Sequence, residues 1–293
     1  MRYLSANTYF RNRFGRKMYK ASVSLDVTCP NRDGSKGTGG CIFCSAGGSG
    51  EFAAPHNKSV NDQIDEAISR VSAKVGDDAG YIAYFQSFTN TYCSPGYLKD
   101  ALESAARHPK VFAVALGTRP DCLSDDMVAM LAGFNEQMPL FVELGLQTSN
   151  DETAKKINRC YATSEFYDAV RRLRDKNIEV IAHVLFGLPG ETKEDMMNSV
   201  RAVAGSGCSG IKFTCLYVLE GTVLADMYAN HEFEVLGMEE YFDIVDSALD
   251  LLPEGMAVHR LTGDGPKRIL IAPEWTKNKR EVINYINRRF GNG

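Results

Sequence analysis

Three of the eight cysteines have a spacing that suits metal ligation. Cys29, Cys41 and Cys44 form a C-x11-C-x2-C pattern within a glycine-rich segment. Iron–sulfur clusters are held by cysteine thiolates, normally four for a cubane, so three cysteines leave one iron open to another ligand. A structural zinc site needs four Cys or His ligands, and the nearest further candidate, His56, lies outside the loop. The spacing therefore favours an iron–sulfur cluster with one open iron.

Short apolar runs that alternate with helical patterns predict the elements that position these cysteines. The runs are Ser22–Val27, Tyr81–Gln86, Val111–Gly117, Leu140–Gln147, Ile178–Gly187 and Ile211–Val218. Between them, Ser124 and Ser164 are candidate N-caps, and Thr192 to Asp195 resembles a capping box. The alternation predicts a parallel α/β structure, either an open doubly wound sheet or a partial barrel. In both, ligands bind beyond the carboxyl ends of the strands.

Polar residues stand at several of these strand ends. Ser87, Thr89 and Asn90 follow the second run, where an Asn/Thr-rich turn is the alternative to a ligand site. Residues Thr118, Arg119 and Asp121, which follow the third run, are cavity candidates, with turn formation as the alternative. We therefore expect a polar cavity where the strands end.

Two further strands carry polar residues on a shared face. Glu143 and Gln147 lie on one face of the fourth run, and a salt bridge to a neighbouring strand is the alternative role for Glu143. If the corresponding faces of the next two runs also point inward, His183 and Lys212 lie in the cavity. They could bind an anionic substrate or move a proton, as catalytic residues, with an ordinary core or surface role as the alternative.

The charges are distributed unevenly along the chain. Net charge is −4, yet residues 1–20 contain six basic side chains and no acidic one, and from Lys277 onward five basic side chains oppose Glu281 alone. Both ends are interleaved with aromatics, a combination that RNA recognition uses, although solvated terminal helices would look the same. The RNA-binding candidates are Arg11, Arg13, Arg16, Lys17, Lys277, Lys279 and Arg280.

The cysteine segment resembles the cluster loop of radical S-adenosylmethionine (SAM) proteins related to the Elongator catalytic subunit. It is most similar to a bacterial subfamily whose loop reads CPNRDG-x-x-G-x-GGC-x-FC. Further similar segments follow in order over almost the entire chain, at 84–92, 117–122, 143–148, 157–159, 186–191 and 272–275. The resemblance implies an α/β radical SAM fold, a partial (βα)6 TIM-like barrel of parallel strands with short N- and C-terminal extensions. We expect a basic extension over residues 1–20, a core over 21–225 and a helical and strand extension over 226–293.

The resemblance also implies the cofactors. Enzymes of this class use a [4Fe–4S] cluster to cleave SAM reductively to a 5′-deoxyadenosyl radical, which abstracts hydrogen from the substrate. Here Cys29, Cys41 and Cys44 would hold the cluster, Arg159 would pair with the SAM carboxylate and Gln147 with its ribose. The other residues implied in SAM binding are Phe43, Ser87, Thr89, Asn90, Glu143, Gly187 and Pro189. The chain departs from the family at Cys160-Tyr161, where Gly-His is usual, and at Thr214, where we expect histidine.

The resemblance finally implies a substrate. The Elongator subunit acts on the wobble uridine of tRNA, and the bacterial subfamily is associated with remodelling its 5-carboxymethylaminomethyl group, so we expect modification of that C5 side chain. The alternatives are radical chemistry on a small metabolite, as in coproporphyrinogen dehydrogenases, and a non-catalytic, metal-stabilised RNA-binding module. The expected partners are tRNA and an electron donor such as flavodoxin or ferredoxin. The chain shows no export signal and no apolar run long enough to cross a membrane, so we expect a cytoplasmic protein.

Overall fold

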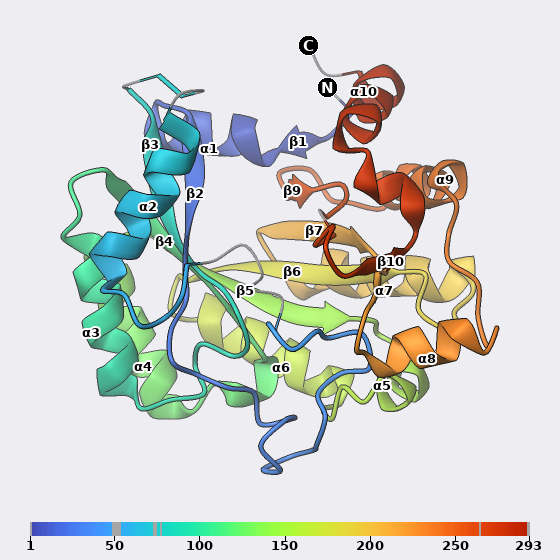
Figure 1. The fold of residues 1–293 in the computed structure, drawn as a ribbon. Coiled ribbons are helices and arrows are strands. Elements are labelled where there is room, and N and C mark those ends of the chain that lie inside the picture. Colours follow the sequence, from blue (N-terminus) through green and yellow to red (C-terminus); the bar gives the residue numbers. More distant parts are fainter. Residues whose placement is uncertain (1, 49–53, 73–74, 77, 264, 292–293) are drawn as a thin grey trace.

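Eight parallel strands form the central sheet of the computed structural model (Figure 1), which describes residues 2–48, 54–72, 75–76, 78–263 and 265–291. Their order is β1-β9-β7-β6-β5-β4-β3-β2, a half-barrel. The six strands expected from the sequence form its continuous part: β2 (Met18–Val23), β3 (Gly80–Phe85), β4 (Val111–Thr118), β5 (Leu140–Gln147), β6 (Glu179–Phe186) and β7 (Gly210–Cys215). The α/β half-barrel of parallel strands is therefore confirmed. Two short strands, β9 (Ala257–Arg260) and β1 (Leu4–Ser5), extend it beyond β7.

Helices cover the outer face of the sheet and bury its apolar side chains. They are α2 (Val60–Ser72), α3 (Pro95–Ala106), α4 (Asp125–Asn135), α6 (Thr163–Arg174), α7 (Lys193–Ser206) and α9 (Met238–Leu249). The capping box at Thr192 and Asp195 is confirmed, as is the Ser124 N-cap. The predicted cap at Ser164 is wrong, because α6 begins at Thr163 with Ala162 as its N-cap, so Ser164 lies inside the helix.

Helix α1 (Ala6–Phe14) closes the end of the barrel where the strands begin (Figure 1). Its Phe10 is 6% exposed and packs against Phe141 at the start of β5, with ring centroids 5.5 Å apart. Ile82, Ala113 and Ile181, from three further strands, belong to the same apolar cluster. The N-terminal segment is therefore part of the barrel core.

The first strand lies earlier in the chain than predicted. The run expected at 22–27 is β2, which spans Met18–Val23 and pairs with β3 from Met18 onward. The boundary expected after residue 20 thus falls inside a strand, and the one after residue 225 falls inside α8 (Val223–Ala229). The start of this strand is predicted too late because Lys20, a charged residue on its inner face, interrupts the apolar pattern.

The C-terminal segment adds a two-stranded antiparallel sheet and a final helix. Strand β8 (Val218–Leu219) pairs with β10 (Leu270–Ala272), and α10 (Lys279–Phe290) follows a short 3-10 turn, Glu274–Lys277. A pocket lined by Ser5 and Asn7 as well as Lys279 and Ile283 shows that α10 lies beside the start of the chain. In the described residues we find no helix with the length and apolar character that a membrane span requires.

Candidate active site

The three cysteines of the loop after β2 line one cavity at the carboxyl end of the strands. Backbone contacts with the segment after α5 (Asp151–Lys156) hold the loop in place: Ile42 N donates to Ile157 O at 3.1 Å, and the Asn158 amide donates to Gly40 O at 2.8 Å. Gly37 permits this fold because a β-carbon there would collide with the side chain of Asn31. The loop sequence thus folds the cysteines toward a common space.

The donor set fits an iron–sulfur cluster, because three cysteine thiols border one cavity. A cubane binds each thiolate to a different iron. Burial, together with the neighbouring Cys44, raises the pKa of the Cys41 thiol to about 12, so its thiolate needs a cationic centre beside it. Cys29, Cys41 and Cys44 would hold that centre.

Several residues expected to contact SAM line the same cavity. They are Phe43, Ser87, Thr89, Glu143 and Gln147. The backbone of Ser87, Phe88 and Gln147 is left-handed, with φ of 82°, 52° and 61°, a conformation that costs energy in non-glycine residues and is common at functional sites. The assignment of these side chains to SAM stays a prediction.

Three residues expected at the SAM site do not line this cavity. The Asn90 amide donates to Gly117 O at 2.8 Å and to Phe85 O at 3.2 Å, so it ties the end of β3 to the end of β4. Gly187 and Pro189 line a different pocket, together with residues that precede α9. Asn90 thus bridges two strand ends, and the glycine turn after β6 lines a second pocket. Contact of these three residues with SAM stays a prediction.

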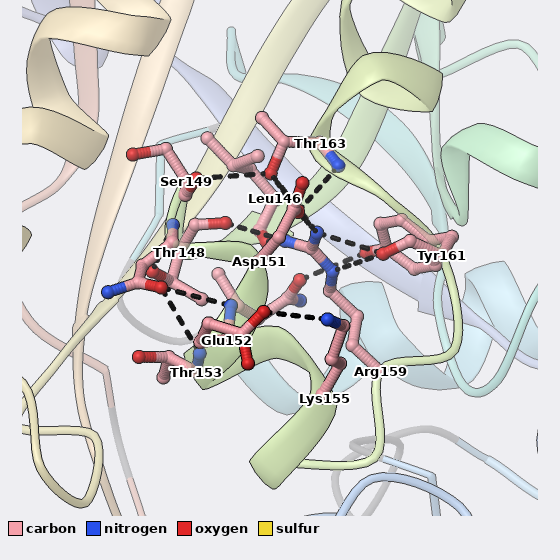
Figure 2. Close-up of polar contacts among 12 residues, drawn as sticks. Leu146, Thr148, Ser149, Asp151, Glu152, Thr153, Lys155, Arg159, Tyr161 and Thr163 are labelled. Carbon is pink, nitrogen blue, oxygen red and sulfur yellow. Dashed lines mark hydrogen bonds and ion pairs between the residues drawn. The ribbon is translucent and has the colours of Figure 1, made fainter.

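Arg159 is also placed differently from the expectation (Figure 2). Its side chain is 1% exposed, and all five N–H groups of the guanidinium donate to the protein itself. The acceptors are the carbonyl oxygens of Leu146, Thr148 and Tyr161, the Asp151 carboxylate and the Thr163 hydroxyl. In this arrangement no N–H remains for a ligand, and the guanidinium fixes the turn between β5 and α6. The expected contact with the SAM carboxylate stays a prediction.

The two expected catalytic residues meet at Glu143 inside the barrel. His183 Nε2 lies 2.8 Å from Glu143 Oε2, and Lys212 Nζ donates to the same carboxylate oxygen. Lys20, on β2, donates to the other oxygen. The Tyr84 ring lies between the two lysines, 4.0 Å from Lys20 Nζ and 4.8 Å from Lys212 Nζ. Of the two readings for Glu143, the interstrand salt bridge is the one present.

Arg260 was missed by the sequence reasoning, because its strand β9 has only four residues and no clear apolar pattern. Its register opposite Lys212 on the neighbouring strand brings it to the same interior. Arg260 donates to Thr214, and within the described part of the chain no carboxylate pairs with it. Lys20, Lys212 and Arg260 thus face a single carboxylate, Glu143.

Burial and these neighbouring charges shift the protonation of the interior, and burial lowers the pKa of Lys212 itself well below its usual range, although Glu143 opposes the shift. Burial alone would raise the pKa of Glu143, but Lys20, Lys212 and His183 hold it well below its usual range. Burial and the charge of Lys212 lower the pKa of His183 to about 4, and burial with the two lysines lowers that of His259 to about 3. Near neutral pH, His183 is uncharged and donates its Nε2 hydrogen to Glu143, which leaves Nδ1 as an acceptor. The interior can therefore bind an anion, and His183 Nδ1 can accept a hydrogen bond.

The RNA-binding candidates lie away from the cysteine cavity. Arg11, Arg16 and Lys17 line a shallow basic pocket beside α1, where the strands begin. Arg13 lies 5.1 Å from the Phe141 ring and pairs with Glu179, so it belongs to the barrel closure. Of the C-terminal candidates, Lys277 pairs with Glu274 at 3.8 Å, Lys279 lines the pocket beside the chain start, and Arg280 lies along α10 with Arg288.

Comparisons with known proteins agree with this fold. Residues 31–203 match the radical SAM superfamily, and residues 208–291 match the radical SAM C-terminal domain. The protein YtqA of Bacillus subtilis is 40% identical over 99% of this chain and 90% of its own length. A tRNA uridine(34) acetyltransferase of Methanocaldococcus infernus is 24% identical over 62% of this chain and 34% of its own length.

A solved structure supports the fold independently. The structure of the archaeal Elp3 of Methanocaldococcus infernus aligns with a TM-score of 0.68 and 18% identity, covering 93% of this chain and 63% of that chain. Members of the matched family bind a [4Fe–4S] cluster and SAM, and the bound cluster supplies the electron that cleaves SAM. The protein is thus an enzyme, and the chain belongs to the radical SAM superfamily.

Proposed function

We propose that this enzyme modifies the C5 side chain of a tRNA wobble uridine by radical chemistry. The observation that carries the proposal is the cationic interior below the cysteine cavity. Among the described residues, Lys20 and Lys212 share Glu143 as their partner, and Arg260 has no carboxylate partner. Unpaired buried charge is costly, so this interior favours a substrate that supplies an anionic group. A carboxylate on the C5 side chain of the base would meet that requirement.

The depth of this site suits a single base that leaves its stack. Glu143 and Lys212 are 1% and 5% exposed, and His183 and Tyr84 line the floor of the cavity that the cysteines border. Enzymes that act on a nucleobase commonly extrude it into such a pocket. In this arrangement Lys212 and Arg260 would bind the anionic end, and His183 would accept a hydrogen bond from the base through Nδ1.

The names of two relatives support tRNA as the nucleic acid substrate. The similar archaeal protein named above acts, by its name, on tRNA uridine 34, and a tRNA-2-methylthio-N(6)-dimethylallyladenosine synthase of Cutibacterium acnes is 22% identical over 80% of this chain. The basic pocket at Arg11, Arg16 and Lys17 would contact phosphates of the same tRNA. A cytoplasmic location and a flavodoxin or ferredoxin as electron donor belong to the proposal.

The test is nucleoside analysis of tRNA treated with the reconstituted holoenzyme, SAM and dithionite. We expect the mass of the wobble uridine to change when its C5 side chain carries a carboxylate. Lys212→Met should abolish this change, while Lys176→Met, an exposed lysine after α6, should leave it intact. If SAM is cleaved but no nucleoside of any tRNA changes, the proposal is wrong, and turnover of a small anionic metabolite becomes the function to test.

A further inference from the structure

A buried arginine contacts one of the three loop cysteines through its side chain. Arg119 follows β4 and is 7% exposed. Its Nη1 lies 3.9 Å from Cys29 Sγ and also donates to the Arg159 carbonyl at 3.1 Å. The guanidinium is thus directed at a thiolate that would bind the cluster.

The charge of Arg119 is balanced by a short chain of ion pairs that leads to the surface. Nε and Nη2 of Arg119 each donate to Asp121 at 2.9 Å. Lys36, on the cysteine loop, donates to Asp121 at 2.7 Å and is 42% exposed. Burial would raise the pKa of Asp121, but Arg119 and Lys36 hold it below its usual range, so it is ionised. From the Cys29 thiolate outward, the charges of Arg119, Asp121 and Lys36 therefore alternate in sign.

We propose that Arg119 raises the reduction potential of the [4Fe–4S] cluster through a charge-assisted hydrogen bond to the Cys29 thiolate, and that Asp121 opposes this effect. Hydrogen bonds to cluster sulfurs and the local charge are two of the factors that set such potentials. The inference concerns the bound cluster alone and does not depend on the tRNA substrate.

The sign of each effect follows from the charge of the added electron. A one-electron donor, such as dithionite or a flavodoxin, gives its electron to the cluster, whose total charge becomes one unit more negative. The positive guanidinium of Arg119 stabilises the reduced form, whereas the carboxylate of Asp121 destabilises it. Burial strengthens both interactions because the surrounding dielectric constant is low.

Arg159 provides an internal comparison. It is also buried, even more deeply than Arg119, but every N–H group of its guanidinium is bound to carbonyl, hydroxyl or carboxylate oxygens. Arg119 differs because one of its donors is directed at sulfur. A purely structural arginine could bind Asp121 and the Arg159 carbonyl without approaching Cys29.

The experiment is a potentiometric titration of the reconstituted holoenzyme, followed by electron paramagnetic resonance without SAM or RNA. Arg119→Gln should shift the midpoint to a more negative potential, and Asp121→Asn should shift it to a less negative one. Lys36→Gln should give a smaller negative shift, because its charge is more distant and more exposed. Arg171→Gln and Asp168→Asn, an exposed ion pair on α6, are the matched controls and should leave the midpoint unchanged.

Iron and sulfide content establishes that each variant holds its cluster. If Arg119→Gln does not assemble one, Asp121→Asn decides the question, because it keeps the arginine and only removes the opposing charge. Shifts of opposite sign in the two variants support the proposal. Equal midpoints, or shifts in the same direction, overturn it, and neither outcome bears on the identity of the substrate.

Discussion

At the scale of single residues, the charges around Glu143 determine how the interior responds to pH. His183 is 24% exposed at its side chain and lies between Glu143 and the cavity. Its pKa in the folded protein is lowered to about 4, compared with about 6.5 in an unfolded chain. The folded state therefore favours the neutral imidazole.

The first prediction is a loss of stability in mild acid. A lowered pKa in the folded state contributes stability that is fully present above the unfolded pKa and is lost as pH falls through the folded pKa. We expect the free energy of unfolding to fall between about pH 6.5 and pH 4, by on the order of 3 kcal/mol for His183. Urea unfolding of the apo protein at several pH values measures this. His183→Gln should flatten the profile, and an unchanged slope would contradict the assignment.

The second prediction concerns Arg159. Since its guanidinium binds only the protein, Arg159→Lys should lower the free energy of unfolding by about 3 kcal/mol, because carbonyl groups that it satisfies lose their partners. Isothermal titration of the holoenzyme should show little change in SAM affinity. The reverse pattern, unchanged stability with weak SAM binding, would restore Arg159 to the cofactor site.

The residue-scale site was only partly predictable from sequence. Glu143, His183 and Lys212 could be found because their strands are long and their faces alternate regularly. Arg260 could not, since a four-residue strand carries almost no periodic signal. Arginine is a suitable residue type for binding a carboxylate. The sequence does not show, however, which backbone carbonyl oxygens accept hydrogen bonds from the buried guanidinium of Arg159.

At the scale of elements, the sequence does not predict that α1 packs into the barrel core. Its basic residues predict an exposed extension, yet Phe10 fills the barrel where the strands begin. The adjoining strand β2 was placed too late because Lys20, which reaches Glu143, interrupts its apolar pattern. Within positions 80–215 four strands closely match the predicted runs, although Glu143 and Lys212 also place charged residues inside strands.

The third prediction tests α1 as a core element. Phe10→Ala should lower the free energy of unfolding by about 3 to 5 kcal/mol, because it removes a buried aromatic ring and leaves a cavity. Ile283→Ala is the control, since that side chain on α10 is 45% exposed and its loss should matter little. If the two variants unfold at the same urea concentration, α1 is the loose extension that the sequence suggests.

At the scale of the whole molecule, the two charged regions occupy opposite ends of the barrel. The loop after β2 lies beyond the carboxyl ends of the strands, whereas α1 lies where the strands begin (Figure 1). The pocket at Arg11, Arg16 and Lys17 is formed by the end of α1 and the residues that precede β3. A partner that uses both must extend along the side of the molecule. An extended polyanion such as tRNA meets that condition better than a small metabolite does.

The fourth prediction follows from this separation. Replacing Arg11, Arg16 and Lys17 by glutamine should weaken tRNA binding and reduce its salt dependence by about one unit of slope for each lost phosphate contact. SAM cleavage without RNA should stay normal, because the pocket is remote from the cysteines. Neutralising three exposed basic residues of the α6 region, Arg171, Arg174 and Lys176, is the control. An unchanged salt slope in the first variant would exclude α1 from the RNA interface.

The most direct test of the assignment is the formation of 5′-deoxyadenosine by the anaerobically reconstituted protein, with dithionite and SAM. The account predicts product from the wild type and none from Cys41→Ser, whose urea unfolding in the apo state should stay close to that of the wild type. No product from a wild type that carries its full complement of iron and sulfide, or equal product from Cys41→Ser, would contradict it.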